Sequence, residues 1–347
     1  MVLGKEKPKT EREKVEERRE EILAQGRKFK YPMQYAKHKL IINTIVVALV
    51  AIILMVVATW ALLYKFQNTG DMIYRVTQVV PVPVAEVAGT KVRYSDYLMI
   101  YRSNLMTTEQ QGGQLGKGED ADAVRDSYKE AAMKSAVEYT YALKLGKEMG
   151  LTVSEAEIDE AFDNHRQVGG VERSEEMFLK IVSDNFGMSK SEYRRMLYLT
   201  LMKAKVTQAV DEPARALVEQ VEQLLAENGG DLVAASEALN GEGTYEETGQ
   251  LVDKMNVDGG RANVAMELEV GQVSPKFLST NGDGYYFVKL AEKTDTQVSY
   301  ESLKIDFTTF TMKVAELYEN GEVEEYITIG GGEEVQDMVE NEEQAEQ

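Results

Sequence analysis

The 347-residue sequence contains no cysteine and only two histidines, His38 and His165. Without cysteine the fold has no disulfides, and thiolate catalysis and cysteine-ligated zinc are excluded. His38 borders a long apolar run, so a catalytic triad or a multi-histidine metal site would rest on His165 alone. We interpret His165 as a residue on the surface of a helix. The sequence implies no metal and no cofactor.

Basic side chains are also scarce, with 39 lysines and arginines against 59 acidic residues. Beyond residue 39 the balance is 27 basic to 52 acidic side chains. Nucleic-acid binding needs clustered cations to displace phosphate counterions, so a nucleic-acid partner is not expected. Acidic pairs arise by chance at this density and do not support a two-carboxylate hydrolase.

Charge is absent from residues 40–64, and such a run exceeds the roughly 20 residues that a helix needs to cross a bilayer. A cleaved signal would have a shorter apolar core and a small-residue site after it, whereas Lys65, Phe66 and Gln67 follow this run. We therefore expect an uncleaved, single-pass anchor. Residues 1–39 carry twelve basic side chains against seven glutamates, which predicts a cytoplasmic N-terminus, with the bulk of the chain outside the cell membrane.

Local patterns divide the remaining chain. Residues 1–30 alternate charge as a solvated helix or a disordered basic arm does, and residues 65–83 are expected to be a linker. Gly89-Thr90 suggests a hairpin turn, Ser95 a helix N-cap, and the Gly- and Gln-rich residues 109–122 a mobile loop. Four helices should follow, two of them opened by the capping boxes Ser154-x-x-Glu and Ser189-x-x-Glu.

The order of these motifs resembles a known domain. The succession VAEVAGTKVRYSDY, LKLGKEMGLTVSEAEIDEAF and EEMFLKIVSDNFGMSKSEYRRMLYLTLMKAKV is similar to the N-terminal chaperone domain of SurA, PrsA and PpiD, the extracytoplasmic parvulin-type folding factors. The resemblance covers residues 84–210. It implies a helical domain that binds unfolded polypeptides.

Residues 211–295 resemble a degenerate parvulin-type peptidyl-prolyl isomerase domain, with GQVSP and GYYFVKL matching the turn and the last strand of the family. Active members carry a histidine on the first and on the last strand. Here Tyr286 stands at the last-strand position, and the first strand is missing before Pro213. Tyr286 is the candidate catalytic residue. We expect residues 303–309, part of a strand-helix-strand extension over 296–330, to fill the missing place, and residues 331–347 to be a disordered acidic tail.

The predicted fold is a single transmembrane helix followed by an all-α chaperone-like domain and an α+β parvulin-like domain. The expected function is a membrane-anchored holdase for unfolded secreted or membrane-protein chains, with the secretion machinery as a further partner. Its binding cleft would lie between the two domains, lined by methionine and tyrosine. Two alternatives stay open. One is an active isomerase with a non-histidine pocket, and the other is a membrane-complex adaptor without folding activity.

Overall fold

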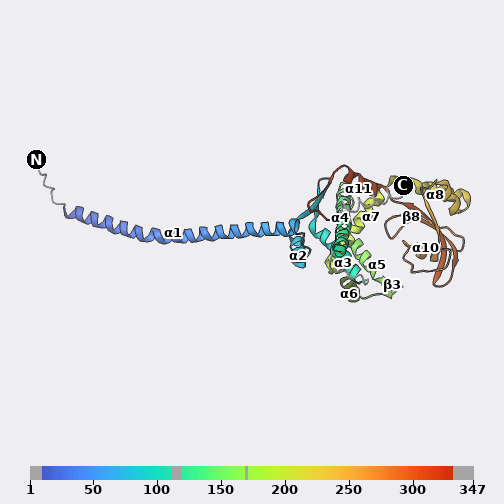
Figure 1. The fold of residues 1–347 in the computed structure, drawn as a ribbon, viewed down its shortest axis with the longest axis horizontal. Coiled ribbons are helices and arrows are strands. Elements are labelled where there is room, and N and C mark those ends of the chain that lie inside the picture. The colour runs from blue at the N-terminus through green and yellow to red at the C-terminus, as the bar shows by residue number, and fades with distance from the viewer. Residues whose placement is uncertain (1–9, 111–118, 169–170, 331–347) are drawn as a thin grey trace. The chain divides into compact units, whose positions relative to one another are not determined.

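The computed structural model describes residues 10–110, 119–168 and 171–330, in two units divided after Asn68 (Figure 1). The first unit is helix α1 (Glu11–Trp60) with a π-helical turn, η1 (Ala61–Lys65). Within the described residues, His38–Lys65 is the one helix long and apolar enough to span a membrane, with a mean hydropathy of 3.1 and no residue of its most apolar stretch buried. The charged N-terminal segment is therefore helical from Glu11 and continuous with the apolar run.

A helix, α2 (Asp71–Val79), lies inside the segment expected to be a linker. Ile73, Tyr74 and Thr77 are buried on one side of it, against α3 (Tyr94–Gln110). The segment is only nine residues long, too short for its 3.6-residue periodicity to stand out in the sequence.

The hairpin is formed by β1 (Pro83–Val87) and β2 (Thr90–Arg93). Ala88 and Gly89 both have positive φ, as a type I′ turn requires. Tyr94 already lies in α3, so Ser95 is inside the helix and does not cap it, contrary to expectation. Both ends of the predicted loop at 109–122 are helical instead, because α3 reaches Gln110 and α4 begins at Glu119; residues 111–118 lie outside the described residues.

The four predicted helices are present. They are α4 (Glu119–Glu148), α5 (Glu155–Arg166), α6 (Glu175–Phe186) and α7 (Lys190–Val210), with the short strands β3 (Gln167–Val168) and β4 (Val171–Glu172) between α5 and α6. Both capping boxes are formed, at Ser154 and at Ser189. Helix α6 ends at Gly187 in the left-handed conformation, as glycine commonly allows. Helix α4 packs on α3 and α7, and α5 packs on α7.

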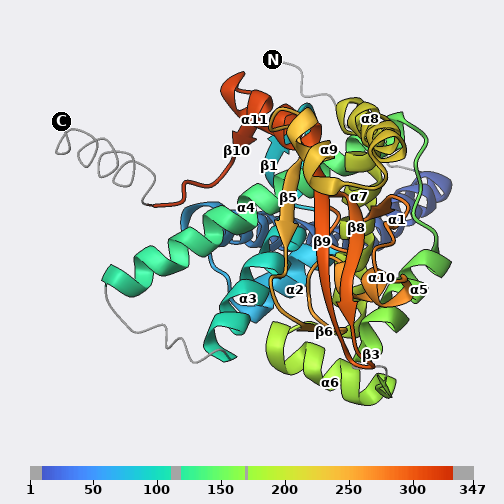
Figure 2. The ribbon, with the colours of Figure 1, turned by 90° about the vertical axis from the view of Figure 1, so that its right-hand side faces the viewer.

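The following segment folds around an antiparallel sheet. Its elements are α8 (Glu212–Asn228), α9 (Leu232–Ala238), β5 (Thr244–Glu247), β6 (Val252–Asp253), α10 (Arg261–Glu267), β7 (Phe277–Leu278), β8 (Gly284–Lys293) and β9 (Gln297–Asp306). The strand order is β5-β9-β8-β7, and β6 also pairs with β9. Figure 2 shows β9 between β5 and β8. The prediction that residues 303–309 join this sheet is confirmed for residues 303–306.

Helices cover both faces of the sheet. On one face Tyr285, Phe287, Leu303 and Ile305 pack against α8 and α9; on the other, Val288, Leu290, Val298 and Tyr300 pack against α10. The centre of β8 is therefore buried on both sides, which explains its nearly continuous run of apolar residues.

The chain then returns to the first hairpin. Helix α11 (Thr309–Glu319) packs on α7, and β10 (Val323–Glu325) pairs antiparallel with β1, giving a three-stranded sheet of order β10-β1-β2. The strand-helix-strand extension was predicted, but its last strand belongs to the helical part of the molecule.

Candidate functional site

Tyr286, the predicted catalytic residue, lies on β8 and is only 4% exposed. Its ring stacks on Phe277 of β7 with 5.9 Å between centroids. The guanidinium of Arg261 lies 5.0 Å from the ring centroid, and the Lys304 ammonium lies 5.8 Å from it. The ring is thus enclosed by an aromatic neighbour and two cations, within the range of cation–π attraction.

The electrostatics of Tyr286 disfavour a role as a base. Burial raises the pKa of its hydroxyl, the Asp283 carboxylate raises it further, and Lys304 and Arg261 only partly oppose the shift. The hydroxyl therefore stays protonated at neutral pH. A protonated, enclosed phenol can donate a hydrogen bond or orient a neighbouring group, but it cannot abstract a proton.

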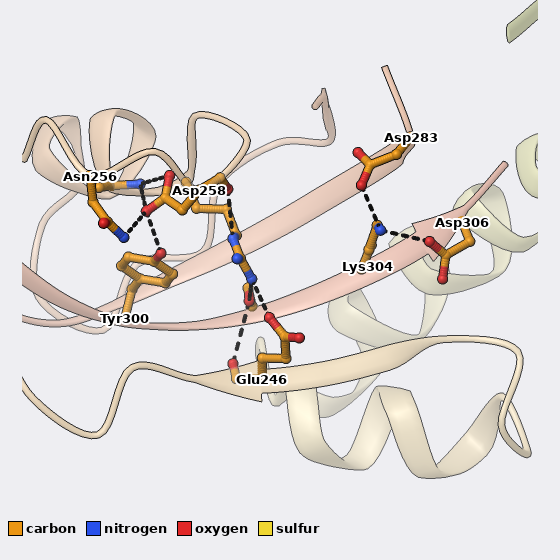
Figure 3. A network of polar contacts seen from close by, with 10 residues as sticks. Glu246, Asn256, Asp258, Asp283, Tyr300, Lys304 and Asp306 are labelled. Carbon is orange, nitrogen blue, oxygen red and sulfur yellow. Dashed lines mark hydrogen bonds and ion pairs between the residues drawn. The ribbon is translucent and has the colours of Figure 1, made fainter. Parts of the chain in front are cut away.

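A polar network joins the sheet to the start of α10 (Figure 3). Asp258 accepts hydrogen bonds from the Tyr300 hydroxyl at 2.6 Å, from Asn256 Nδ2 at 3.1 Å and from the backbone N–H of Ala262 at 3.2 Å. Arg261 donates to the Asp258 carbonyl oxygen at 2.9 Å and to Glu246 Oε2 at 2.5 Å. Burial lowers the pKa of Arg261, but the Glu246 carboxylate outweighs it and the net shift is upward.

A second charged group lies further along the sheet. Lys304 Nζ is 2.7 Å from a carboxylate oxygen of Asp283 and 2.7 Å from one of Asp306. Burial lowers the pKa of Lys304, yet the two carboxylates outweigh it, so the ammonium stays charged. In both groups each cation is paired with carboxylates, and these pairs are only partly buried. These contacts fit a structural scaffold better than an activated nucleophile.

A cleft of about 340 Å³ opens between α4, α7 and the turn that precedes β8. Its wall combines aromatic rings, hydroxyl groups and a lysine; the lining residues are Tyr139, Thr200, Lys203, Ala204, Thr207, Asn281, Gly282, Asp283, Phe307, Phe310 and Thr311. The turn approaches α7 closely, since a Cβ placed on Gly282 would lie only 3.6 Å from the Cβ of Ala204 on that helix. Gln208 Nε2 also donates to the Tyr285 hydroxyl, at 3.2 Å. The cleft is therefore bounded by helices of the helical domain on one side and, on the other, by the loop before β8 in the sheet-containing segment.

Lys203 is the main charged group on the helical wall of this cleft. Its ammonium lies 2.5 Å from Glu138 Oε2 and 5.8 Å from the ring centroids of both Tyr139 and Phe310. The pairing with Glu138 neutralises the lysine locally, while the two rings offer apolar surface. Such a wall can accept apolar side chains and hydrogen-bond a polypeptide backbone through its threonines.

The lining differs from the expected one. It includes Tyr139 but no methionine, because Met133 and Met202 are buried in the helical core, and Met177 and Met312 are exposed elsewhere. Phe307 precedes α11 and Phe310 lies in its first turn, and neither residue gave a separate signal in the sequence. His165 lies on the surface of α5 as predicted, with Nδ1 2.7 Å from the Tyr193 hydroxyl, and partial desolvation of its ring lowers its pKa.

The sequence was compared with known protein families. The family described as the SurA-like N-terminal domain matches residues 33–207, about half of the chain, from within α1 nearly to the end of α7. The chain therefore belongs to this family. Membership indicates a chaperone-like folding factor of the SurA and PrsA type. No curated protein sequence matches the chain significantly.

Proposed function

We propose that this protein is a membrane-anchored, extracytoplasmic holdase that binds unfolded polypeptides in the cleft between α4, α7 and the turn before β8. The observation that carries the proposal is the composition of that cleft, with aromatic rings beside hydroxyl groups in a protein of the SurA-like family. Aromatic surface binds apolar side chains of many sequences, and hydroxyls satisfy exposed backbone groups. A holdase needs this combination, because its clients share no sequence.

The proposed topology follows from charge. A cytoplasmic segment over 1–39, a span over 40–64 and an acidic exterior agree with the positive-inside rule. Because the chain lacks cysteine, single-cysteine variants can test this by labelling in intact cells with a membrane-impermeant maleimide. Labelling at an introduced cysteine in place of Met312, and not of Val15, is expected. The reverse pattern would contradict the topology.

We further propose that residues 211–306 form a parvulin-related domain without isomerase activity. The support is the environment of Tyr286, whose ring is enclosed and whose two neighbouring cations are each paired with a carboxylate. Lowering an X-Pro barrier of ~18–20 kcal/mol requires a pocket that accepts and desolvates the peptide bond. An exchange assay with the full chain should show no isomerisation. Catalysis lost in Tyr286→Phe would instead establish the isomerase.

The holdase proposal is tested by suppression of client aggregation, using the full chain in nanodiscs. Tyr139→Ser removes a ring from the cleft, and Tyr198→Ser, a half-buried tyrosine of α7 outside the cleft lining, is the matched control. Only Tyr139→Ser should weaken the suppression. Equal loss in both variants would contradict the cleft, and no suppression by the wild type, together with a co-purifying membrane complex, would favour the adaptor function.

A further inference from the structure

Helix α2 is held firmly on the helical domain by its inward face. Asp71 pairs with Arg102, and Arg102 also donates to the Thr69 carbonyl oxygen at 3.0 Å. At the other end, the Tyr74 hydroxyl donates to Glu192 Oε1 at 2.5 Å, and Gln78 Nε2 donates to the same oxygen at 2.9 Å. These contacts, together with the buried Ile73, fix which side of α2 faces outward.

The outward side of α2 is apolar. Met72 is 80% exposed and Val79 is 84% exposed, while Val76 between them is partly exposed. These positions are spaced i, i+4 and i+7 and therefore form one stripe along the helix. Val80 extends the stripe, and Arg75 stands beside it. Methionine and valine at such exposure have no role in the packing of this domain.

Only a short connection separates this stripe from the apolar helix along the chain. The N–H groups of Phe66 and Asn68 donate to the carbonyl oxygens of Ala61 and Leu62 at 2.9 and 2.8 Å, and Gln67 has a φ of 44°. This turn keeps Asn68 beside the last turn of the helix. Asp71 is three residues further on, and such a segment spans at most about 10 Å.

We propose that the outward face of α2 lies on the phospholipid bilayer, with Met72, Val76 and Val79 at the boundary of headgroups and acyl chains. The inference rests on the proposed membrane anchor. Residues 69–347 carry 26 basic and 52 acidic side chains, so attraction to anionic lipid is not the driving force. The driving force is apolar contact with the lipid, and the covalent tether to the membrane anchor removes most of the entropic cost of reaching the bilayer surface. Because α2 is fixed to α3 and α7, this contact sets the direction in which the helical domain projects from the membrane.

The test uses the full chain in vesicles of phosphatidylcholine and phosphatidylethanolamine, with a polarity-sensitive fluorophore on single introduced cysteines. The sites are Met72→Cys on the stripe, Leu49→Cys within the span, and two matched controls. The controls are Met177→Cys and Met312→Cys, which replace methionines that are 58% and 60% exposed on α6 and α11. Brominated lipids quench a fluorophore only where it enters the acyl region.

Quenching at positions 49 and 72, with none at 177 and 312, is the expected result. Adding Val79→Gln should reduce quenching at position 72, because it replaces an exposed apolar side chain of the stripe without touching the core. A probe at position 72 that is unquenched while position 49 is quenched would overturn the α2 proposal and leave the anchor intact. An unquenched probe at position 49 would overturn the anchor and the α2 proposal together. Quenching at all four sites would also refute it, since binding would not be specific to α2.

Discussion

The buried carboxylate of Asp211 links three segments at the centre of the molecule, and its removal should be costly. The residue is 0% exposed and stands between α7 and α8. Its Oδ1 accepts the N–H of Ala214 at 3.1 Å, so it caps α8. Its Oδ2 accepts the N–H groups of Thr308 and Thr309, at 2.7 and 2.9 Å, where α11 begins. One side chain therefore satisfies two helix N-termini.

The cost of Asp211→Ala can be estimated from these three bonds. A hydrogen bond to a charged group contributes about 1.5–3 kcal/mol, and water can replace part of it at the partly exposed N–H groups of α11. We expect a loss of about 3–5 kcal/mol in the free energy of unfolding. Asp231→Ala is the matched control, because Asp231 caps α9 through a single exposed bond to the N–H of Ala234 at 3.0 Å. That loss should be about 1 kcal/mol.

Urea unfolding of the full chain in detergent micelles, followed by far-ultraviolet circular dichroism, measures both losses. Tryptophan fluorescence is unsuitable, because Trp60 is the sole tryptophan and lies in the apolar helix. Hydrogen exchange at the start of α11 should accelerate in Asp211→Ala and not in Asp231→Ala. If the two variants unfold at the same urea concentration, Asp211 does not link the segments as argued, and the reasoning from buried caps is wrong.

Three further predictions concern pH and packing. The ion pair with Lys205, followed by the hydrogen bonds with Ser154, lowers the pKa of Glu157 to about 2. The ionised side chain therefore stabilises the fold above the unfolded pKa of 4.5, and this stabilisation is lost as the pH falls from 4.5 to 2. Glu157→Gln should flatten the acid side of a profile of melting temperature against pH. Burial, and then the nearby Glu130, raise the pKa of Glu325. Ionisation of Glu325 therefore destabilises the fold as the pH rises through its raised pKa. Glu325→Gln should raise the melting temperature at pH 7 but not at pH 4. In Gly284→Ala the new Cβ would lie 2.3 Å from a carbonyl oxygen of β9, so a loss of about 3 kcal/mol or more in urea unfolding is expected, and an unchanged midpoint would contradict this register.

Local signals in the sequence predicted most of the helical domain. Both capping boxes, at Ser154 and Ser189, depend on residues only three positions apart, so the sequence contains all the information they need. The same holds for the turn at Gly89 and the helix end at Gly187. Strand β9 was predictable from the alternation of its residues, and its pairing with β5 and β8 confirms that residues 303–306 join the sheet.

The failures concern tertiary contacts. Ser95 has the chemistry of an N-cap, but the preceding Tyr94 is buried and already helical. Helix α2 is stabilised by Glu192, 118 residues from its partner Tyr74, and no local pattern reports such a bond. A cleft between the two predicted domains was expected for a holdase, yet the aromatic lining of the observed cleft depends on how α11 turns after β9. The geometry around Tyr286 was likewise not readable, because Arg261 reaches it from a separate helix.

The pairing of β10 with β1 makes the helical half of the molecule depend on the end of the chain. Tyr326 donates to Glu86 at 3.0 Å across 240 residues, and its N–H donates to the Val84 carbonyl oxygen at 2.9 Å. Until β10 arrives, β1 has an open edge, and such edges pair readily with other chains. The entropic cost of closing a loop rises only slowly with its length, but a contact between such distant residues forms late in folding. The helical domain is therefore built from two distant segments, 69–210 and 309–327, and the sheet domain is inserted between them. The proposed client cleft at this junction has both of its walls only after α4 and α7, the loop before β8 and α11 have come together.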